Sequence, residues 1–169
     1  MSVDDLQVTP LGPHHDRAAF TCGEATLDRY LREQASQDRK RSLSRCYVLI
    51  RASEPARVVG YYTLSAHSLR LRDLPEDAAR GIPYRDVPGV LIGRLALDVR
   101  EQGRGLGERL LAAAVEHCAR LESELGLRVI VVDALSEGAA RFYERFGFQR
   151  FGSGELRLFL SLRHVRPRA

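Results

Sequence analysis

A glycine-rich stretch between a strand pattern and a helix pattern constrains the fold of this chain more than any other feature. Residues 102–107 read Gln-Gly-Arg-Gly-Leu-Gly, with glycine at every second position from 103. Glycine at the mouth of a helix costs backbone entropy, so its repeated use there indicates a need for conformations or close approaches that other residues disfavour. An apolar helical stripe follows at once, made of Leu106, Leu110, Ala114, Cys118, Leu121 and Leu125.

A loop of this kind favours a phosphate group. The first N–H groups of a helix have no partner within it and carry a partial positive charge, and glycine lets phosphate oxygens approach the backbone. Arg104 could add a charged contact. The stretch is neither GxxxxGK[ST] nor GxGxxG, which excludes a P-loop and a dinucleotide fingerprint. A plain strand-to-helix turn is the alternative.

Strand and helix patterns alternate around this loop and predict a mixed α/β fold in one domain, residues 1–169. In the strand before the loop, alternation puts Leu95, Leu97 and Val99 on one face and Arg94, Ala96 and Asp98 on the other. Residues 72–89, with three prolines, are expected to form a loop with at most one helical turn. The expected strands are 6–11, 46–51, 57–67, 90–99, 127–134 and 155–162, and the expected helices are 24–40, 106–125 ended by Gly126, and 137–146 capped by Ser136 and ended by Gly147.

Composition narrows the class of protein. The chain has 169 residues, of which 44% are hydrophobic, and no apolar run approaches ~18 residues, so no membrane span is expected. The acidic N-terminus lacks the apolar core of a secretory signal, so we expect a cytoplasmic protein. Cys22, Cys46 and Cys118 lie far apart and no Cys/His cluster has ligand spacing, which favours packing cysteines and predicts neither a disulfide framework nor a metal site.

Charge is distributed unevenly along the chain. The net charge is +4, but residues 29–45 hold six basic and two acidic groups, and residues 157–169 hold four arginines and no acid. Such clustering suggests an anionic partner, although a solvated helix face is the alternative for the first cluster.

Two motifs carry a resemblance to a known family. Residues 102–107 match Q/R-x-x-G-x-G/A, and residues 139–148, AARFYERFGF, look like A-x-x-F-Y-x-x-x-G-F. In this order and separation they resemble the GNAT superfamily of acetyl-CoA-dependent N-acetyltransferases. Longer segments are similar to the GNAT toxins of bacterial toxin–antitoxin pairs, which acetylate the amino group of aminoacyl-tRNA.

The resemblance implies a fold, a cosubstrate and site residues. The fold would be a GNAT-like mixed β-sheet, split between the central parallel strands 90–99 and 127–134 and flanked by helices. The backbone at Leu97 and Val99 would pair with the pantetheine amides of acetyl-CoA. Tyr143 would protonate the departing thiolate, since a phenol with a pKa near 10 keeps its proton at pH 7; an aromatic core residue is the alternative. The other cofactor-binding residues would be Gln102, Gly103, Arg104, Gly105, Leu106, Gly107, Glu108 and Ser136.

The resemblance also implies partners. Charged tRNA would be the substrate, a ribbon–helix–helix antitoxin the regulator and a homodimer the oligomeric state. The residues expected to bind tRNA phosphates are Arg39, Lys40, Arg41, Arg45 and Arg94. Tyr61 and His67 could line the acceptor side, although packing is favoured for both. Two other functions stay open: an acetyltransferase acting on a small-molecule or protein amine, and a CoA-binding module without turnover.

Overall fold

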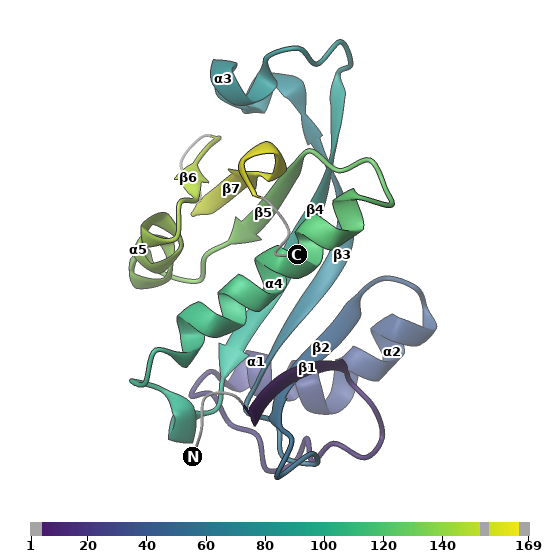
Figure 1. Ribbon diagram of the computed structural model, residues 1–169, viewed down its shortest axis with the longest axis vertical. Helices are drawn as coiled ribbons and strands as arrows, with labels where there is room; N and C mark the ends of the chain where they lie inside the picture. Colours follow the sequence, from purple (N-terminus) through teal and green to yellow (C-terminus); the bar gives the residue numbers. More distant parts are fainter. Residues whose placement is uncertain (1–4, 153–155, 166–169) are drawn as a thin grey trace. The chain divides into compact units, whose positions relative to one another are not determined.

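The computed structural model describes residues 5–152 and 156–165 and contains a seven-stranded mixed sheet with the strand order β1-β2-β3-β4-β5-β7-β6 (Figure 1). The strands are β1 Leu6–Pro10, β2 Arg45–Arg51, β3 Gly60–Arg70, β4 Asp86–Leu97, β5 Val129–Asp133, β6 Gln149–Arg150 and β7 Arg157–Ser161. The α-helices are α1 Ala25–Arg29, α2 Ala35–Lys40, α3 Glu76–Ala79, α4 Leu106–Glu122 and α5 Glu137–Arg145. The parallel pairing of β4 with β5 and the alternation of strands and helices confirm the expected α/β class.

The chain divides into two compact units. The first holds the residues up to Ser65 together with Arg94–Ala113, and the second holds Ala66–Gly93 together with the chain from Ala114 onward. The strands β3 and β4 and the helix α4 therefore contribute residues to both units.

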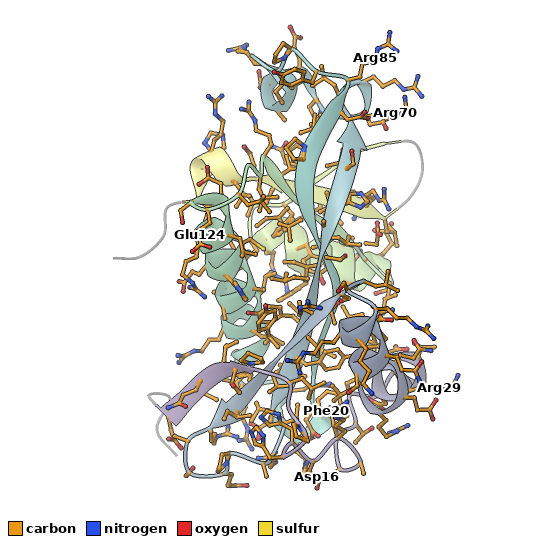
Figure 2. All side chains as sticks on the ribbon, turned by 90° about the vertical axis from the view of Figure 1, so that its right-hand side faces the viewer. Asp16, Phe20, Arg29, Arg70, Arg85 and Glu124 are labelled. Atoms are coloured by element: carbon orange, nitrogen blue, oxygen red, sulfur yellow. The ribbon has the colours of Figure 1, made fainter. Side chains whose placement is uncertain are left out.

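In the first unit, β1, β2 and the first half of β3 form an antiparallel ladder. The expected apolar stripe of the first helix is confirmed, because Leu31 and Ala35 are buried and Leu27 packs against the same core. Phe20 lies among these core side chains, whereas Arg29 points away from them (Figure 2). Cys46 is buried in this core too, as expected for a packing residue.

The single helix expected over residues 24–40 is interrupted. Tyr30–Gln34 form a π-helical segment between α1 and α2, with the Ala35 N–H donating to the carbonyl oxygen of Tyr30, five residues back. Tertiary contacts fix this segment: the Tyr30 hydroxyl donates to Asp38 at 2.8 Å, and the Arg94 guanidinium lies 3.5 Å from the centre of the Tyr30 ring. The first contact stays within the helical region, and the second joins it to β4, which local helical patterns do not reveal.

The strand before the glycine loop differs from its predicted form. It begins at Asp86, so the expectation of a loop through residue 89 is wrong, and it ends at Leu97 rather than at residue 99. Val99 opens a 3-10 turn, Val99–Glu101, because the Asp98 side chain accepts a hydrogen bond from the Arg100 N–H and caps that turn. Ala96 and Asp98, predicted to share a face, are both buried, whereas Leu95 and Leu97 of the other face are half-buried and Val99, outside the strand, is 45% exposed.

The second unit contains the parallel pair. Gly89–Ile92 of β4 pair with Val129–Val132 of β5, and the pairing ends there although β4 continues to Leu97. All four of these β5 residues are buried, which confirms the prediction of a central strand from a continuous apolar run. The strand expected over 155–162 is β7, and its start at residue 155 falls outside the described residues. The two-residue strand β6 was not predicted.

Two helix ends show how local signals succeed and fail. Ser136 caps α5 by accepting the Ala139 N–H at 3.1 Å, and Gly147 follows the helix with a φ of +105°, both as predicted. The helix α4 ends at Glu122, before the expected end, and Leu125 is 61% exposed. The Ser123 hydroxyl donates to the Arg120 carbonyl there, which satisfies a helix-end acceptor and leaves Gly126 without the expected role.

Candidate functional site

The glycine loop needs left-handed backbone at two positions. Gly103 has a φ of +79° and Gly105 a φ of +75°, and α4 begins at the next residue, Leu106. A Cβ atom at either glycine would meet no heavy atom within 4 Å, so the requirement is one of backbone conformation and not of space inside the protein. The loop therefore leaves open space beside the backbone just where the unpaired N–H groups of α4 begin.

A buried carboxylate immediately before the loop fixes its start. The Glu101 side chain is 3% exposed and accepts two hydrogen bonds from Arg51, at 2.8 and 2.7 Å, and one from Arg57 at 2.6 Å. The hydrogen bonds from Arg51, together with those from Arg57, lower the pKa of Glu101 to about 2. Glu101 is thus a fixed anion that ties the loop to β2 and to the turn after it.

A second buried carboxylate holds the other side of the 3-10 turn. Asp98 is fully buried and accepts from Arg100 Nε at 2.9 Å and from the Thr21 N–H at 3.3 Å. Burial alone would raise the pKa of Asp98, but the hydrogen bonds from Arg100 and Thr21 hold it below its usual value. Neither Glu101 nor Asp98 was predicted as part of the site, because each reads in sequence as an ordinary surface charge.

Three of the predicted cofactor contacts are used inside the protein. Gln102 Nε2 donates to the carbonyl oxygens of Cys22 and Leu97, each at 3.0 Å, so the Gln102 side chain braces the loop. The Val99 N–H donates to the Thr21 carbonyl at 2.8 Å. The Leu97 carbonyl and the Val99 N–H therefore have partners within the protein, and the pairing of the backbone around Leu97 and Val99 with the pantetheine amides stays a prediction.

The remaining loop residues differ in exposure. Arg104, Gly105 and Glu108 are exposed, Gly107 is half-buried and Leu106 is buried. Arg104 Nη1 lies 4.0 Å from Glu101 Oε2. The exposed members of the loop thus include one cation that could reach a bound anion.

Tyr143, on α5 in the second unit, is buried and unusual among the buried tyrosines. Its ring packs edge-to-face against Phe142 and Phe148, with the centroids 5.4 and 5.6 Å away and the planes tilted by 61° in each pair. The hydroxyls of Tyr30 and Tyr61 donate to Asp38 and to the Leu27 carbonyl, whereas no described residue accepts a hydrogen bond from Tyr143. Burial raises the pKa of Tyr143 to about 12, so the phenol keeps its proton at neutral pH.

Tyr61 and His67, expected near the acceptor side, and Ser136, expected to bind the cofactor, differ in their surroundings. Tyr61 is fully buried and hydrogen-bonded, which confirms the packing interpretation. His67 is half-buried, and its pKa is lowered by burial. Ser136 uses its oxygen as the cap of α5.

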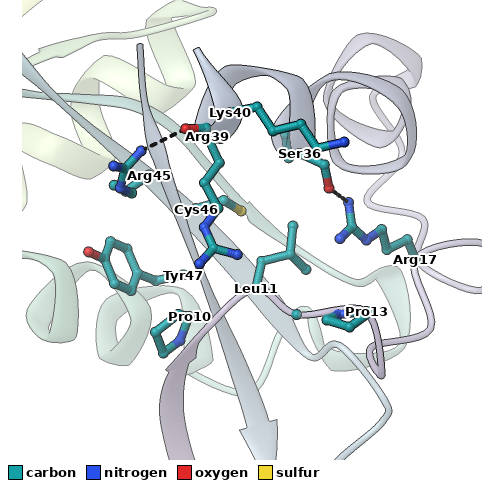
Figure 3. Close-up of a pocket in the computed structure, with 12 residues that line it drawn as sticks. Pro10, Leu11, Pro13, Arg17, Ser36, Arg39, Lys40, Arg45, Cys46 and Tyr47 are labelled. Atoms are coloured by element: carbon teal, nitrogen blue, oxygen red, sulfur yellow. Dashed lines mark hydrogen bonds between the residues drawn. The ribbon is translucent and has the colours of Figure 1, made fainter. Parts of the chain in front are cut away.

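The predicted basic residues separate into three places. Arg39, Lys40 and Arg45 line one pocket of about 560 Å³ together with Arg17, which the sequence did not single out (Figure 3). We call this the basic pocket; its other lining residues are Pro10, Leu11, Gly12, Pro13, Ala35, Ser36, Cys46 and Tyr47. Arg41 is exposed at the end of α2 and does not line the pocket. Arg94 lies against the Tyr30 ring, and Arg166 and Arg168 of the basic tail fall outside the described residues.

The predicted site residues are thus divided between the two units. The loop, Leu97, Val99 and the basic pocket belong to the first unit, and Ser136 and Tyr143 belong to the second. Within the described residues, no helix has the length and apolar character needed to cross a bilayer. In the same part of the chain, no three His, Cys, Asp or Glu residues gather closely enough to hold a metal ion.

Comparison with known proteins gives concordant matches. Residues 42–150 match the family model described as acetyltransferase (GNAT) domain. The chain is 40% identical to the tRNA-acetylating toxin of Mycobacterium tuberculosis over 151 residues, which is 89% of each protein.

Solved structures of toxins are also similar. The AtaT toxin complexed with acetyl-methionyl-tRNAfMet superimposes with a TM-score of 0.87 at 32% identity, covering 94% of this chain and 96% of that one. A tyrosine-to-phenylalanine mutant of AtaT, bound to the C-terminus of the antitoxin AtaR and to acetyl-CoA, superimposes with a TM-score of 0.79 at 30% identity, with 95% of each chain covered.

The anchor of the loop makes a prediction about stability. Glu101→Gln leaves Arg51 buried without its anionic partner, so we expect the free energy of unfolding at pH 7 to fall by about 3 kcal/mol or more. The pKa of Glu101 is about 2 in the folded chain and near 4.5 when unfolded, so its contribution is complete above pH 4.5 and is lost as the pH falls toward 2. Urea denaturation between pH 3 and 7 measures both effects.

Glu124→Gln is the matched control, because Glu124 is exposed and makes no ion pair among the described residues. The structural role of Glu101 would be contradicted if both variants had the same stability and the same acid sensitivity as the wild type.

Proposed function

We propose, from the fact that the chain belongs to the acetyltransferase (GNAT) family, that it transfers an acetyl group from acetyl-CoA to the amino group of aminoacyl-tRNA and so blocks translation. The observation that carries the proposal is the braced glycine loop with two left-handed glycines at the start of α4. Support for the substrate comes from the relatives, one named a tRNA-acetylating toxin and one complexed with acetyl-methionyl-tRNA.

The residues of the loop fit the pyrophosphate of acetyl-CoA. The space beside Gly103 and Gly105 is open, the first N–H groups of α4 have no partner inside the helix, and Arg104 is exposed. Gly103, Arg104, Gly105, Leu106, Gly107 and Glu108 would therefore hold the phosphates through their backbone, while Gln102 keeps the loop in shape. The backbone around Leu97 and Val99 would meet the pantetheine amides through groups other than the Val99 N–H, which donates to Thr21.

Tyr143 would act as the general acid. Acetyl-CoA supplies an activated thioester, and the reaction forms a C–N bond, breaks the C–S bond and leaves a sulfur that needs a proton. The raised pKa keeps the Tyr143 hydroxyl protonated, and that hydroxyl has no competing acceptor among the described residues. The amine would lose its proton to solvent, because an aminoacyl ester amine is less basic than a lysine side chain.

The proposal extends to partners and setting. We propose that residues 1–169 act as one acetyltransferase domain, that the protein is a cytoplasmic homodimer, and that a ribbon–helix–helix antitoxin restrains it. A relative bound to the C-terminus of its antitoxin supports the existence of such a partner. The basic residues Arg39, Lys40, Arg41, Arg45 and Arg94 would meet tRNA phosphates.

The decisive experiment offers labelled acetyl-CoA with three kinds of acceptor: total charged tRNA, peptides and polyamines. We expect the label to enter aminoacyl-tRNA. Alkali should then release it from the tRNA as a labelled N-acetyl amino acid. If peptides or polyamines become labelled while charged tRNA does not, the protein is an acetyltransferase of small-molecule or protein amines instead. If no acceptor becomes labelled, a CoA-binding module without turnover is favoured.

The cofactor assignment is tested by a change of charge at one loop position. Asp and Asn both tolerate the left-handed backbone of Gly105, so Gly105→Asp and Gly105→Asn differ mainly in charge. We expect the affinity of the Asp variant for acetyl-CoA to be at least about tenfold lower than that of the Asn variant, because the Asp carboxylate would face the phosphates. Calorimetric affinities that are equal for the two variants would remove the loop from the cofactor site.

The acid role is tested by removing one hydroxyl. Tyr143→Phe keeps the packing against Phe142 and Phe148, so acetyl-CoA affinity should stay nearly constant while turnover falls by about 10²-fold or more. Tyr62→Phe on β3 is the control for loss of a phenol from the core. Near-normal turnover in the Tyr143 variant would make Tyr143 a core residue only.

The tRNA surface is tested by charge reversal. Replacing Arg39, Lys40 and Arg41 together by Glu should weaken acetylation of charged tRNA and flatten its dependence on salt, because fewer counterions are released on binding. Acetyl-CoA binding should not change, since these residues lie outside the loop. Unchanged tRNA acetylation at physiological salt would show that the three residues are only a solvated helix end.

A further inference from the structure

The basic pocket holds four cations and no carboxylate. Arg17, Arg39, Lys40 and Arg45 line it, and none of its twelve lining residues is acidic. Asp38, the acidic residue within α2, accepts a hydrogen bond from the Tyr30 hydroxyl at 2.8 Å and does not line the pocket. Four like charges around one cavity favour an anion inside it.

The partners of these four cations differ from those of five arginines elsewhere in the chain. Arg51, Arg57, Arg100, Arg150 and Arg157 all contact carboxylates at 3 Å or less. Within residues 5–152 and 156–165, the four cations of the basic pocket form no ion pair.

Two of them are nevertheless held in place by neutral acceptors. Arg17 donates to Ser36 Oγ at 2.7 Å, and Arg45 donates to the Arg39 carbonyl at 3.1 Å (Figure 3). Their positions are thus fixed while their charge stays uncompensated.

The opposite wall of the pocket is apolar. It is lined by Pro10, the last residue of β1, by Leu11 and Pro13 after it, and by Tyr47 of β2 (Figure 3). The Tyr47 ring stacks on Tyr62, with centroids 5.4 Å apart and planes 24° apart, so its orientation is fixed. Figure 3 shows the Arg39 side chain reaching down between Tyr47 and Leu11, which brings a guanidinium to the border of the two walls.

We infer that the basic pocket binds one phosphorylated nucleoside, its phosphate against Arg17, Arg39, Lys40 and Arg45 and its base against Pro10, Leu11 and Tyr47. A volume of about 560 Å³ lies in the range of small-ligand sites. A bare phosphate would leave the apolar wall unused, whereas a base stacks on aromatic and guanidinium planes as in single-stranded RNA recognition.

Two sources could supply this ligand: a nucleotide of the substrate tRNA or a free nucleotide. The first rests on the proposed function and makes the pocket a subsite for tRNA, and the second makes it a separate binding site. Both share the chemistry of a phosphate joined to a base, so the same variants test both.

The experiment compares two double variants that each remove two positive charges. Arg39→Gln with Lys40→Gln changes the pocket, and Arg29→Gln with Arg32→Gln changes exposed residues of the same helical region that do not line it. Arg29 points outward in Figure 2. The probes are deacylated tRNA, adenosine 5′-monophosphate and inorganic phosphate, each titrated into full-length protein saturated with acetyl-CoA so that the cofactor loop is occupied.

We expect the affinity of the pocket variant for deacylated tRNA or for the mononucleotide to fall at least about tenfold. The affinity of the control variant should fall by less than about threefold. Inorganic phosphate should bind the wild type much more weakly than the nucleotide does. Loss confined to tRNA assigns the pocket to the substrate, and loss that includes the mononucleotide assigns it to a free ligand. Equal effects of the two double variants on both probes, or inorganic phosphate binding as tightly as the nucleotide, would overturn the inference.

Acetylation of charged tRNA by the wild type, measured in parallel, keeps the two proposals apart. A wild type that never acetylates charged tRNA contradicts the proposed function, whereas the binding comparison still decides the pocket. A wild type that acetylates charged tRNA, with identical binding by both double variants, contradicts the pocket alone. Unchanged thermal unfolding and acetyl-CoA affinity of both variants show that they are folded.

Discussion

The geometry of the glycine loop depends on one buried ion cluster. Glu101 brings its charge out of water, and the cost of that desolvation is offset by three short hydrogen bonds from Arg51 and Arg57. The cluster has one anion and two cations, so it does not oppose a phosphate in the loop that begins one residue later. Asp98 and Gln102 add hydrogen bonds on either side of Glu101, and together the three residues fix the backbone from which the loop starts.

Local patterns were sufficient to predict the elements around this loop. The alternating strand, the glycines, the apolar stripe of α4, the buried run of β5 and the Ser136 cap all follow from residues close together in sequence. The resemblance to the GNAT family rested on the same segments, and the family assignment is confirmed.

Features that depend on distant residues escaped prediction. Arg51 and Glu101 are fifty residues apart, and nothing around either one signals the pairing. Val99 continues the apolar alternation of β4 but leaves the strand, because Asp98 caps a turn and Thr21 takes the Val99 N–H. The sequence also offered two roles for Tyr143 that are not exclusive: its ring packs like a core residue, while its hydroxyl, unlike those of Tyr30 and Tyr61, has no acceptor among the described residues.

The π-helical segment Tyr30–Gln34 has a consequence for how this chain can change over evolutionary time. A π-helical turn accommodates one residue more than an α-helical turn, so deleting a single residue there would restore a continuous α-helix. Because the π turn and the α turn each complete about one revolution, the residues after the deletion would keep their direction around the helix axis. Ala35 would stay on the core side, and Arg39 and Lys40 would still face the pocket that they line. The change would fall on the turn itself, where Tyr30 contacts Asp38 and Arg94, so this helical region can lose a residue without losing its arrangement of cations.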